Sequence, residues 1–122
     1  MNGIVVFEIF PNGCLNGVYS NDHLDTKNEI FNEIARKISG EESDEILGVY
    51  ACSYIDVGNI VKNCVLVISN PLLRKPPRVR KGQYDFTWYR DYNPKTKKGN
   101  IIFEGTGWRT RENQITVSYR DI

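Results

Sequence analysis

Residues 100–122, NIIFEGTGWRTRENQITVSYRDI, alternate between two kinds of side chain, and this pattern constrains the fold more than any other part of the chain. Phe103, Gly105 and Gly107 alternate with bulkier or more polar residues, and the alternation resumes through ITVSY after the turn-like RTREN. Successive side chains of a β-strand point to opposite faces. The segment is therefore predicted to be a β-hairpin with one buried and one wetter face.

Gly105 and Gly107 leave a bare patch on the inward face of this hairpin. A strand without side chains lets a ring or another backbone approach closely, or lets the sheet bend sharply. We expect Trp88, or another large aromatic residue of the preceding strand, to fill the patch; the alternative is a groove that enlarges a pocket. The pattern indicates a small, strongly curved antiparallel sheet.

Five segments upstream have the alternation or the β-rich composition of strands. They lie at residues 3–10, 14–20, 46–55, 63–69 and 83–90. Asn12-Gly13 joins the first two, and Asn-Gly is a strong signal for a tight hairpin. With the terminal hairpin the chain is predicted to contain seven strands, or eight if residues 73–79 add one.

One segment departs from this pattern and predicts an amphipathic helix over about residues 26–39. Thr26 and Glu29 form the signature of a capping box, and Gly40 is a natural residue to end a helix. Isoleucines recur at i, i+4 and i+8, which places them on one stripe of a helix. The residues expected to be buried by this stripe are Ile30, Phe31, Ile34 and Ile38.

The predicted fold class is mainly β, with α+β character. We expect a highly curved antiparallel sheet or small β-barrel of seven or eight strands, with the helix inserted after the second strand. An open sheet with the helix on one face is the alternative. At 122 residues the chain has the length of a single domain, residues 1–122.

The N-terminus lacks a basic region before its apolar stretch, so no signal peptide is expected, and no run is long enough to predict a membrane-spanning helix. Three widely spaced cysteines without a C-x-x-C motif suit a reducing compartment, which predicts a cytoplasmic protein.

The sequence has no catalytic or cofactor motif. His23 is the only histidine, and no nucleophile elbow, phosphate-binding loop or metal-spaced cluster occurs. We therefore expect a non-enzymatic binding module without a metal or another cofactor.

A ligand cavity inside the barrel is the leading functional hypothesis. Buried Tyr and Trp side chains need partners for their polar atoms, and rings with a few polar tips are typical of small-molecule pockets. A solid core with satisfied hydroxyls is equally compatible with this composition. The candidate lining residues are Tyr19, Tyr50, Tyr54, Trp88 and Trp108.

Single-stranded nucleic-acid binding through residues 74–98 is the alternative. Cations that hold phosphates are interleaved there with rings that could stack on bases. The net charge of +1 argues against a dedicated nucleic-acid binder, and the strict alternation of Tyr84, Phe86 and Trp88 also fits a protein core. The candidate cations are Arg74, Lys75, Arg78, Arg80, Lys81 and Arg90.

The strand openings LNGVY and ILGVY, a tryptophan-bearing strand and the FEGTGW hairpin resemble the small meander barrels of the calycin type, the lipocalin and avidin-like group. The lipocalin G-x-W signature corresponds here to G-V-Y at Gly17–Tyr19 and Gly48–Tyr50. The segments FEGTGW and NQITVSY also resemble small uncharacterised bacterial proteins. These resemblances imply a barrel and a ligand, and they assign no residue to a site.

The partner is thus expected to be an unidentified small apolar or aromatic molecule or a protein, with nucleic acid as the alternative and no membrane. A homodimer is a further hypothesis, because an incompletely closed sheet leaves edges that another strand can pair with.

Overall fold

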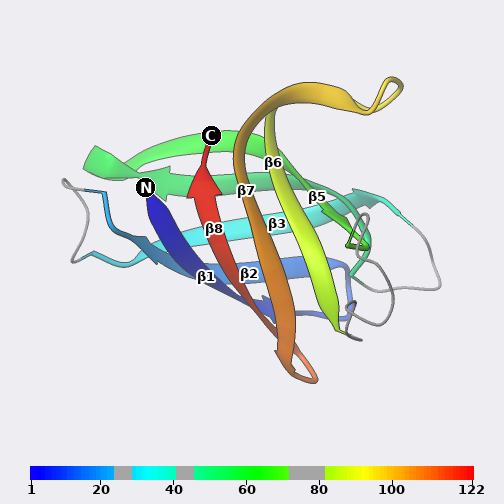
Figure 1. The fold of residues 1–122 in the computed structure, drawn as a ribbon, viewed down its shortest axis with the longest axis horizontal. Helices are drawn as coiled ribbons and strands as arrows, with labels where there is room; N and C mark the ends of the chain where they lie inside the picture. Colours follow the sequence, from blue (N-terminus) through cyan, green and yellow to red (C-terminus); the bar gives the residue numbers. More distant parts are fainter. Residues whose placement is uncertain (24–28, 41–45, 72–81) are drawn as a thin grey trace.

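The computed structural model describes residues 1–23, 29–40, 46–71 and 82–122. These residues form a closed antiparallel barrel in which eight strands follow one another in sequence order, and the last strand returns to pair with the first (Figure 1). The strands are β1 (Asn2–Ile9), β2 (Cys14–Asn21), β3 (Phe31–Ser39), β4 (Gly48–Asp56), β5 (Ile60–Ser69), β6 (Gln83–Asn93), β7 (Lys98–Arg111) and β8 (Gln114–Asp121). A short 3-10 turn, Val57–Asn59, joins β4 to β5. The prediction of a mainly β, strongly curved antiparallel fold is confirmed.

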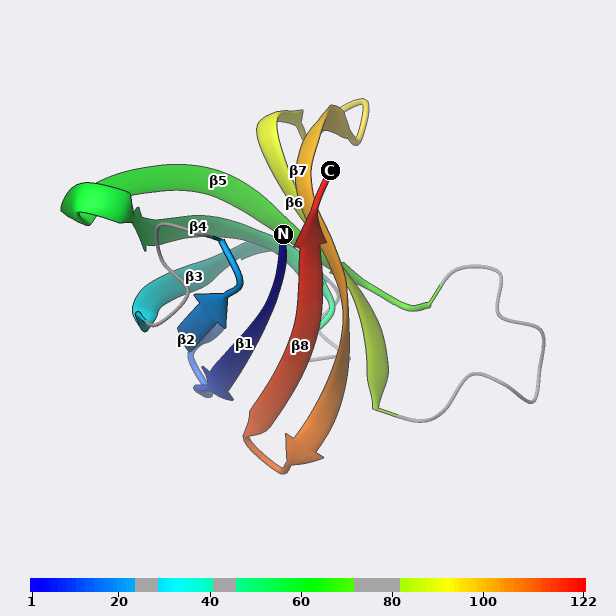
Figure 2. The ribbon, with the colours of Figure 1, turned by 60° about the vertical axis from the view of Figure 1, so that its left-hand side comes forward.

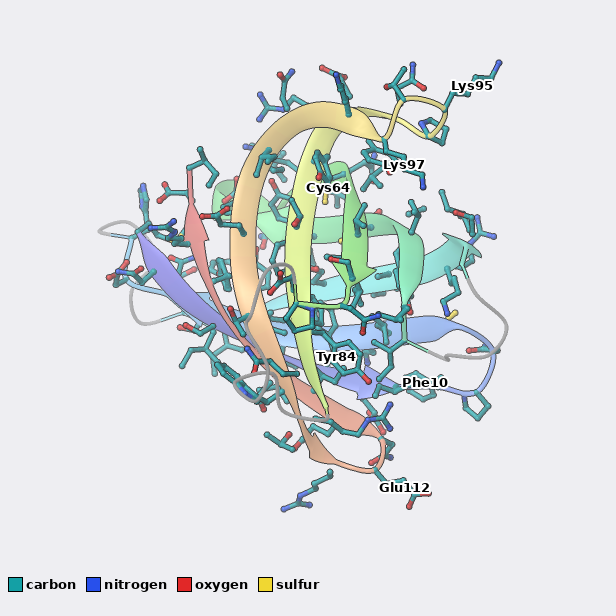
Figure 3. All side chains as sticks on the ribbon, turned by 45° about the vertical axis from the view of Figure 1, so that its right-hand side comes forward. Phe10, Cys64, Tyr84, Lys95, Lys97 and Glu112 are labelled. Carbon is teal, nitrogen blue, oxygen red and sulfur yellow. The ribbon has the colours of Figure 1, made fainter. Side chains whose placement is uncertain are left out.

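The inward face of each strand follows the alternation in the sequence. In β1, for example, Val5, Phe7 and Ile9 are buried, whereas Ile4 and Glu8 between them are exposed. The same period continues around the barrel, and the inward side chains form one core. The two chain termini lie close together at one end of the barrel (Figure 2). Phe10 and Glu112 lie in turns at the other end (Figure 3).

Aromatic rings cover glycines on neighbouring strands. A Cβ atom on Gly107 would lie 2.5 Å from Cε1 of Phe86, and one on Gly17 would lie 2.7 Å from Cε1 of Phe7. The expected aromatic cover over the β7 glycines is therefore present at Gly107, and the ring is Phe86 rather than Trp88. At Gly105 the obstacle is backbone, because a Cβ atom there would meet the carbonyl oxygen of Ser118. These close approaches let the strands curve tightly around a packed interior.

The predicted helix over residues 26–39 is wrong for the part that the structure describes. Residues 31–39 form β3, which pairs with β2 on one side and β4 on the other. Residues 26–28, with the start of the capping box, lie outside the described residues. A spacing of four residues is even, so it places side chains on one face of a strand as well as on one face of a helix. The isoleucines at 30, 34 and 38 accordingly lie outside the barrel with exposed fractions of 74%, 59% and 52%.

Closure of the barrel removes the sheet edges on which the homodimer hypothesis depended. Strand β1 pairs with both β2 and β8, so the two outermost strands in sequence protect each other. The N-terminal ammonium also forms an ion pair of 3.0 Å with Asp121 across this seam. The homodimer remains a prediction, but unpaired sheet edges no longer support it.

Candidate functional site

A cavity of about 510 Å³ lies at the end of the barrel that holds the termini. Residues from β2 to β8 line it, together with Met1, which precedes β1. Most of these residues lie in the parts of the strands that are nearest to the chain termini. The cavity therefore occupies the half of the barrel at that end, which we call the open half. The opposite half is filled by side chains such as Phe7, Leu66, Phe86 and Ile115, all of which are buried.

Five aromatic side chains form much of the cavity wall, and we call them the aromatic cup: Tyr19, Tyr54, Trp88, Phe103 and Tyr119. They come from β2, β4, β6, β7 and β8, and each contacts at least two others, with ring centroids 5.8 to 6.5 Å apart. Most pairs meet edge to face, the arrangement that ring quadrupoles favour. The rings therefore hold one another in place around the cavity.

The tyrosine hydroxyls of the cup are neutral, polar tips. Burial raises the pKa of Tyr54 and of Tyr119 to about 12, and it raises the pKa of Tyr19 further. Tyr19 donates its hydroxyl hydrogen to the carbonyl oxygen of Ile55, and the Tyr119 oxygen accepts a hydrogen bond from Asn21 Nδ2 at 3.3 Å. These bonds fix two of the three rings at their polar ends.

A β-bulge aims two consecutive residues of β7 at the core. Trp88 pairs with Phe103 and Tyr89 pairs with Ile101, so Ile102 has no partner of its own in β6. The extra residue breaks the alternation, and both Ile102 and Phe103 pack against the core and line the cavity. Bulges commonly redirect side chains in this way next to binding sites.

A buried carboxylate, Glu33, lies among the cavity-lining residues. Its strand places it inward between the exposed Asn32 and Ile34, and it has an exposed fraction of 6%. Its Oε2 atom accepts hydrogen bonds from Trp88 Nε1 at 2.9 Å and from Cys52 Sγ at 3.2 Å. Among the described residues it is the only charged side chain in the buried class.

The protonation equilibrium of Glu33 reflects its burial. Desolvation raises the pKa of this carboxyl group to about 7, against the opposing effect of the hydrogen bonds from Trp88 and Cys52. Contact with the Cys64 thiol, burial and the nearby Glu33 carboxylate together raise the pKa of Cys52, so this thiol keeps the proton that it donates. Cys52 and Cys64 are free thiols opposite each other in β4 and β5.

Charged groups at the cavity rim are largely paired with each other. Lys62 Nζ lies 2.9 Å from Asp56 Oδ2, and the N-terminal ammonium lies 3.0 Å from Asp121 Oδ1. Arg90 is an exposed cation on the rim, two residues beyond Trp88 in β6. The rim is therefore polar and near neutral apart from Arg90, whereas the wall beneath it is aromatic with a single carboxylate.

The five predicted lining residues divide into three that line the cavity and two that do not. Tyr19, Tyr54 and Trp88 are members of the aromatic cup. Tyr50 is completely buried in the filled half, where its hydroxyl donates to the carbonyl oxygen of Ile46 at 2.7 Å. Trp108 lies on the outer face with an exposed fraction of 44%, as the parity of β7 requires.

The structure describes only part of the segment on which the nucleic-acid hypothesis rests. Arg74, Lys75, Arg78, Arg80 and Lys81 lie outside the described residues, and Arg90 is at the cavity rim. Phe86 and Trp88 are buried, so neither can stack on a base. Lys95 and Lys97 lie at the β6–β7 hairpin, with Lys95 at its tip, away from the barrel (Figure 3).

Sequence reasoning missed Glu33, Phe103 and Tyr119 as members of this site. For the last two the signal was present, because the alternation in the terminal hairpin already placed both on the inward face. Glu33 was assigned to the polar side of a helix. A period-2 interpretation of residues 31–39 places Glu33 on the face opposite Ile34, but it does not say which of the two faces is buried. No local signal distinguished the two periods.

Comparisons with protein families, curated proteins and solved structures find no match to this chain. The architecture, a closed meander of eight antiparallel strands, is compatible with a calycin-like barrel. Within the described ranges, no cluster of three or more His, Cys, Asp or Glu side chains is arranged to hold a metal ion. None of the described segments forms a helix of the length and apolarity needed to cross a membrane.

Proposed function

We propose that this protein is a non-enzymatic binding barrel of the calycin type, which holds a small ligand with an apolar or aromatic body in the aromatic cup. The observation that carries the proposal is the aromatic lining of a cavity inside one end of the barrel. Its volume of about 510 Å³ falls within the range of small-molecule pockets, roughly 300–1,000 Å³, but hollows on the outer face have similar volumes, so the lining and not the volume distinguishes it. Its wall combines five rings with a few polar tips, the composition that such pockets use for affinity and orientation.

The contrast between the two halves of the barrel supports a binding role. A barrel of eight strands can be filled by its own side chains or can hold one small ligand. Here one half is filled. In the other half, hydrogen bonds from Tyr19 to the Ile55 carbonyl and from the Asn21 side chain to Tyr119 hold the walls around a cavity. The free thiols of Cys52 and Cys64 suit the cytoplasmic location that forms part of the proposal.

Native mass spectrometry of protein purified from its own host tests the proposal directly. We expect a retained small molecule, released on denaturation, with about one molecule per chain. Ile102→Trp should reduce the retained fraction, because the larger side chain would extend from the cavity lining into the cavity. Ile4→Trp is the matched control, since it adds the same ring on the exposed face of β1. Equal retention by both variants and the wild type would place the ligand outside the cup.

Nucleic-acid binding remains the second candidate because of one exterior feature. The ring centroids of Tyr89 and Tyr92 in β6 lie 4.9 Å apart, and β6 leads into the β6–β7 hairpin with its exposed lysines. Labelled single strands titrated at low and moderate salt test this candidate. Steeply salt-dependent binding that is lost on charge removal at Arg78, Arg80 and Lys81 would support it. No binding even at low salt would eliminate it.

A further inference from the structure

We propose that the ligand of the aromatic cup is a small organic amine, a protonated nitrogen on an apolar or aromatic body, which enters with its nitrogen directed at Glu33. This inference rests on the proposed ligand-binding function and specifies the chemical class of the ligand. It follows from four features of the cup: the position of the carboxylate, the groups that contact it, the rings around it, and the charges at the rim.

The carboxylate of Glu33 is satisfied by the protein on one oxygen. Both of its hydrogen bonds, from Trp88 and Cys52, end on Oε2. Oε1 accepts none of the hydrogen bonds found among the described residues. Every fully buried side-chain oxygen in that part of the chain has a hydrogen-bond partner, so an oxygen without one, such as Oε1, is not fully buried. Oε1 is therefore accessible from the cavity that Glu33 lines. A ligand in the cup would meet a carboxylate oxygen with free acceptor capacity.

Within the described part of the chain, the groups that contact this carboxylate are neutral donors, and none is a cation. Burying an ionised carboxylate is costly unless a positive group accompanies it. The indole and the thiol donate hydrogen bonds but carry no charge, and burial outweighs them in setting the pKa of Glu33. A protonated amine in the cavity would provide the missing positive charge, together with hydrogen-bond donors for Oε1.

The rings around Glu33 favour the same ligand. Aromatic faces attract cations through the ring quadrupole, with Trp and Tyr more effective than aliphatic walls. Trp88 donates to Glu33 and also contacts Phe103 and Tyr119 in the cup, so the carboxylate and the rings form one connected lining. A site that combines aromatic walls with a carboxylate suits an amine better than an anion or a neutral alcohol.

The charges at the rim set the orientation of the ligand. Lys62 and the N-terminal ammonium are paired with Asp56 and Asp121, so the two acids at the rim compete little for an amine. Arg90 adds a positive charge at the rim and would repel a nitrogen placed there. The favoured orientation places the nitrogen inside, near Glu33, and the apolar end outward.

Three probes of one shape test the inference by calorimetry on the full chain: tryptamine, its alcohol tryptophol, and the acid indole propionate. Phenethylamine and phenethyl alcohol form a second, smaller pair. The titrations are done near pH 8, roughly one unit above the pKa of Glu33 of about 7 and below the usual range of an alkylamine. Each amine should bind roughly tenfold to hundredfold more tightly than its alcohol, as expected for hydrogen bonds to a charged group, and the acid should bind most weakly.

Glu33→Gln isolates the carboxylate, because the amide keeps an oxygen to accept from Trp88 and Cys52 but cannot carry the charge. In this variant the preference for amine over alcohol should fall to about onefold, while binding of tryptophol is retained. Glu104→Gln is the matched control, since it makes the same change at an exposed carboxylate bonded to Arg120. That variant should keep the preference. The comparison of amine with alcohol on the wild type needs no variant, so a folding defect in Glu33→Gln does not prevent a decision.

Equal binding of amine and alcohol to the wild type, or tightest binding of the acid, would overturn the amine inference. The ligand-binding function would survive that result if Ile102→Trp still blocked the probes and Ile4→Trp did not. A preference for the amine that persists in Glu33→Gln would also overturn the inference, because the charge would then be recognised elsewhere. Failure of every probe to bind the wild type at millimolar concentration would reject the cup as an aryl-amine site. The retained-ligand measurement would then decide the broader function separately.

Discussion

The two halves of this barrel contain similar aromatic side chains but pack them differently. In the half that contains Phe7 and Phe86, the two rings stack with centroids 6.0 Å apart, and glycines on neighbouring strands receive them. In the half that contains Glu33, the rings contact one another around a cavity instead of filling it. Glycines receive rings in both halves, because Tyr119 of the cup lies against Gly3 as Phe86 lies against Gly107. The comparison teaches that a ring seated on a glycine does not by itself fill the barrel, since Tyr119 still borders the cavity.

The largest expected effect concerns the filled half. Phe86→Ala should lower the free energy of unfolding by about 3–5 kcal/mol, because it removes a fully buried ring and leaves a hole beside Gly107. Phe103→Ala in the cup should cost only about 1–2 kcal/mol, since that ring already borders a cavity that water can enter. Urea unfolding of both variants measures the difference. Equal losses would mean that the cup contributes as much to the core as the filled half does.

Glu33 should make the stability of the wild type depend on pH in an unusual direction. The folded pKa of about 7 lies above the ordinary value of 4.5, so the folded state binds more protons than the unfolded state between these values. Stability contributed by the protonated form is therefore complete below about pH 4.5 and is lost as the pH rises through 7. The expected loss is on the order of 3 kcal/mol, from 1.36 kcal/mol for each pKa unit.

Glu33→Gln provides the reference for this measurement, because subtracting its pH dependence removes the contribution of every group that the variant and the wild type share. The tyrosines of the cup and Cys52 have raised pKa values and stay protonated throughout, and the charged groups at the rim are common to both proteins. The difference in unfolding free energy between variant and wild type should grow in favour of the variant from about pH 4 to about pH 8, a range that contains the titration window of 4.5 to about 7. A constant difference would show that Glu33 titrates normally and is not desolvated.

Gly107→Val tests the packing of the Phe86 ring against Gly107 in the filled half. The new side chain would meet the ring of Phe86, so the variant should lose roughly 1–3 kcal/mol through overpacking. The double variant Gly107→Val with Phe86→Leu should recover part of the loss, since it removes the ring that clashes. Unfolding midpoints of the single and double variants provide the test, and a near-neutral single variant would contradict the packed arrangement.

The smallest effect is expected on the outer face of β3. Ile34→Ala should change the free energy of unfolding by less than about 1 kcal/mol, because the side chain is 59% exposed and its removal leaves no buried hole. Its inward neighbour Ala35 is fully buried, so Ala35→Leu should destabilise by about 1–3 kcal/mol through overpacking. A larger loss of unfolding free energy in Ile34→Ala than in Ala35→Leu would contradict the strand and support the helix that the sequence pattern predicted.

Much of the barrel could be predicted from local patterns. The strands before and after the helix prediction lie close to where the alternation placed them, and the inward parity of Tyr19, Tyr54 and Trp88 was correct. This success has a local cause, because the direction of a side chain in a strand depends only on its parity. Parity also placed Trp108 outside, which should have removed it from the candidate lining residues.

The sequence by itself determined that the chain is an antiparallel sheet with a ring-rich interior, because period-2 alternation and turn residues act over a few positions. Only the tertiary structure decided the state of residues 31–39, where isoleucines spaced by four satisfy a helix and a strand equally. Pairing with β2 and β4 selected the strand, and that choice turned Glu33 inward and the isoleucines outward. The cup likewise required the bulge at Ile102 and the closure of β1 on β8, which depend on contacts between residues far apart in the chain.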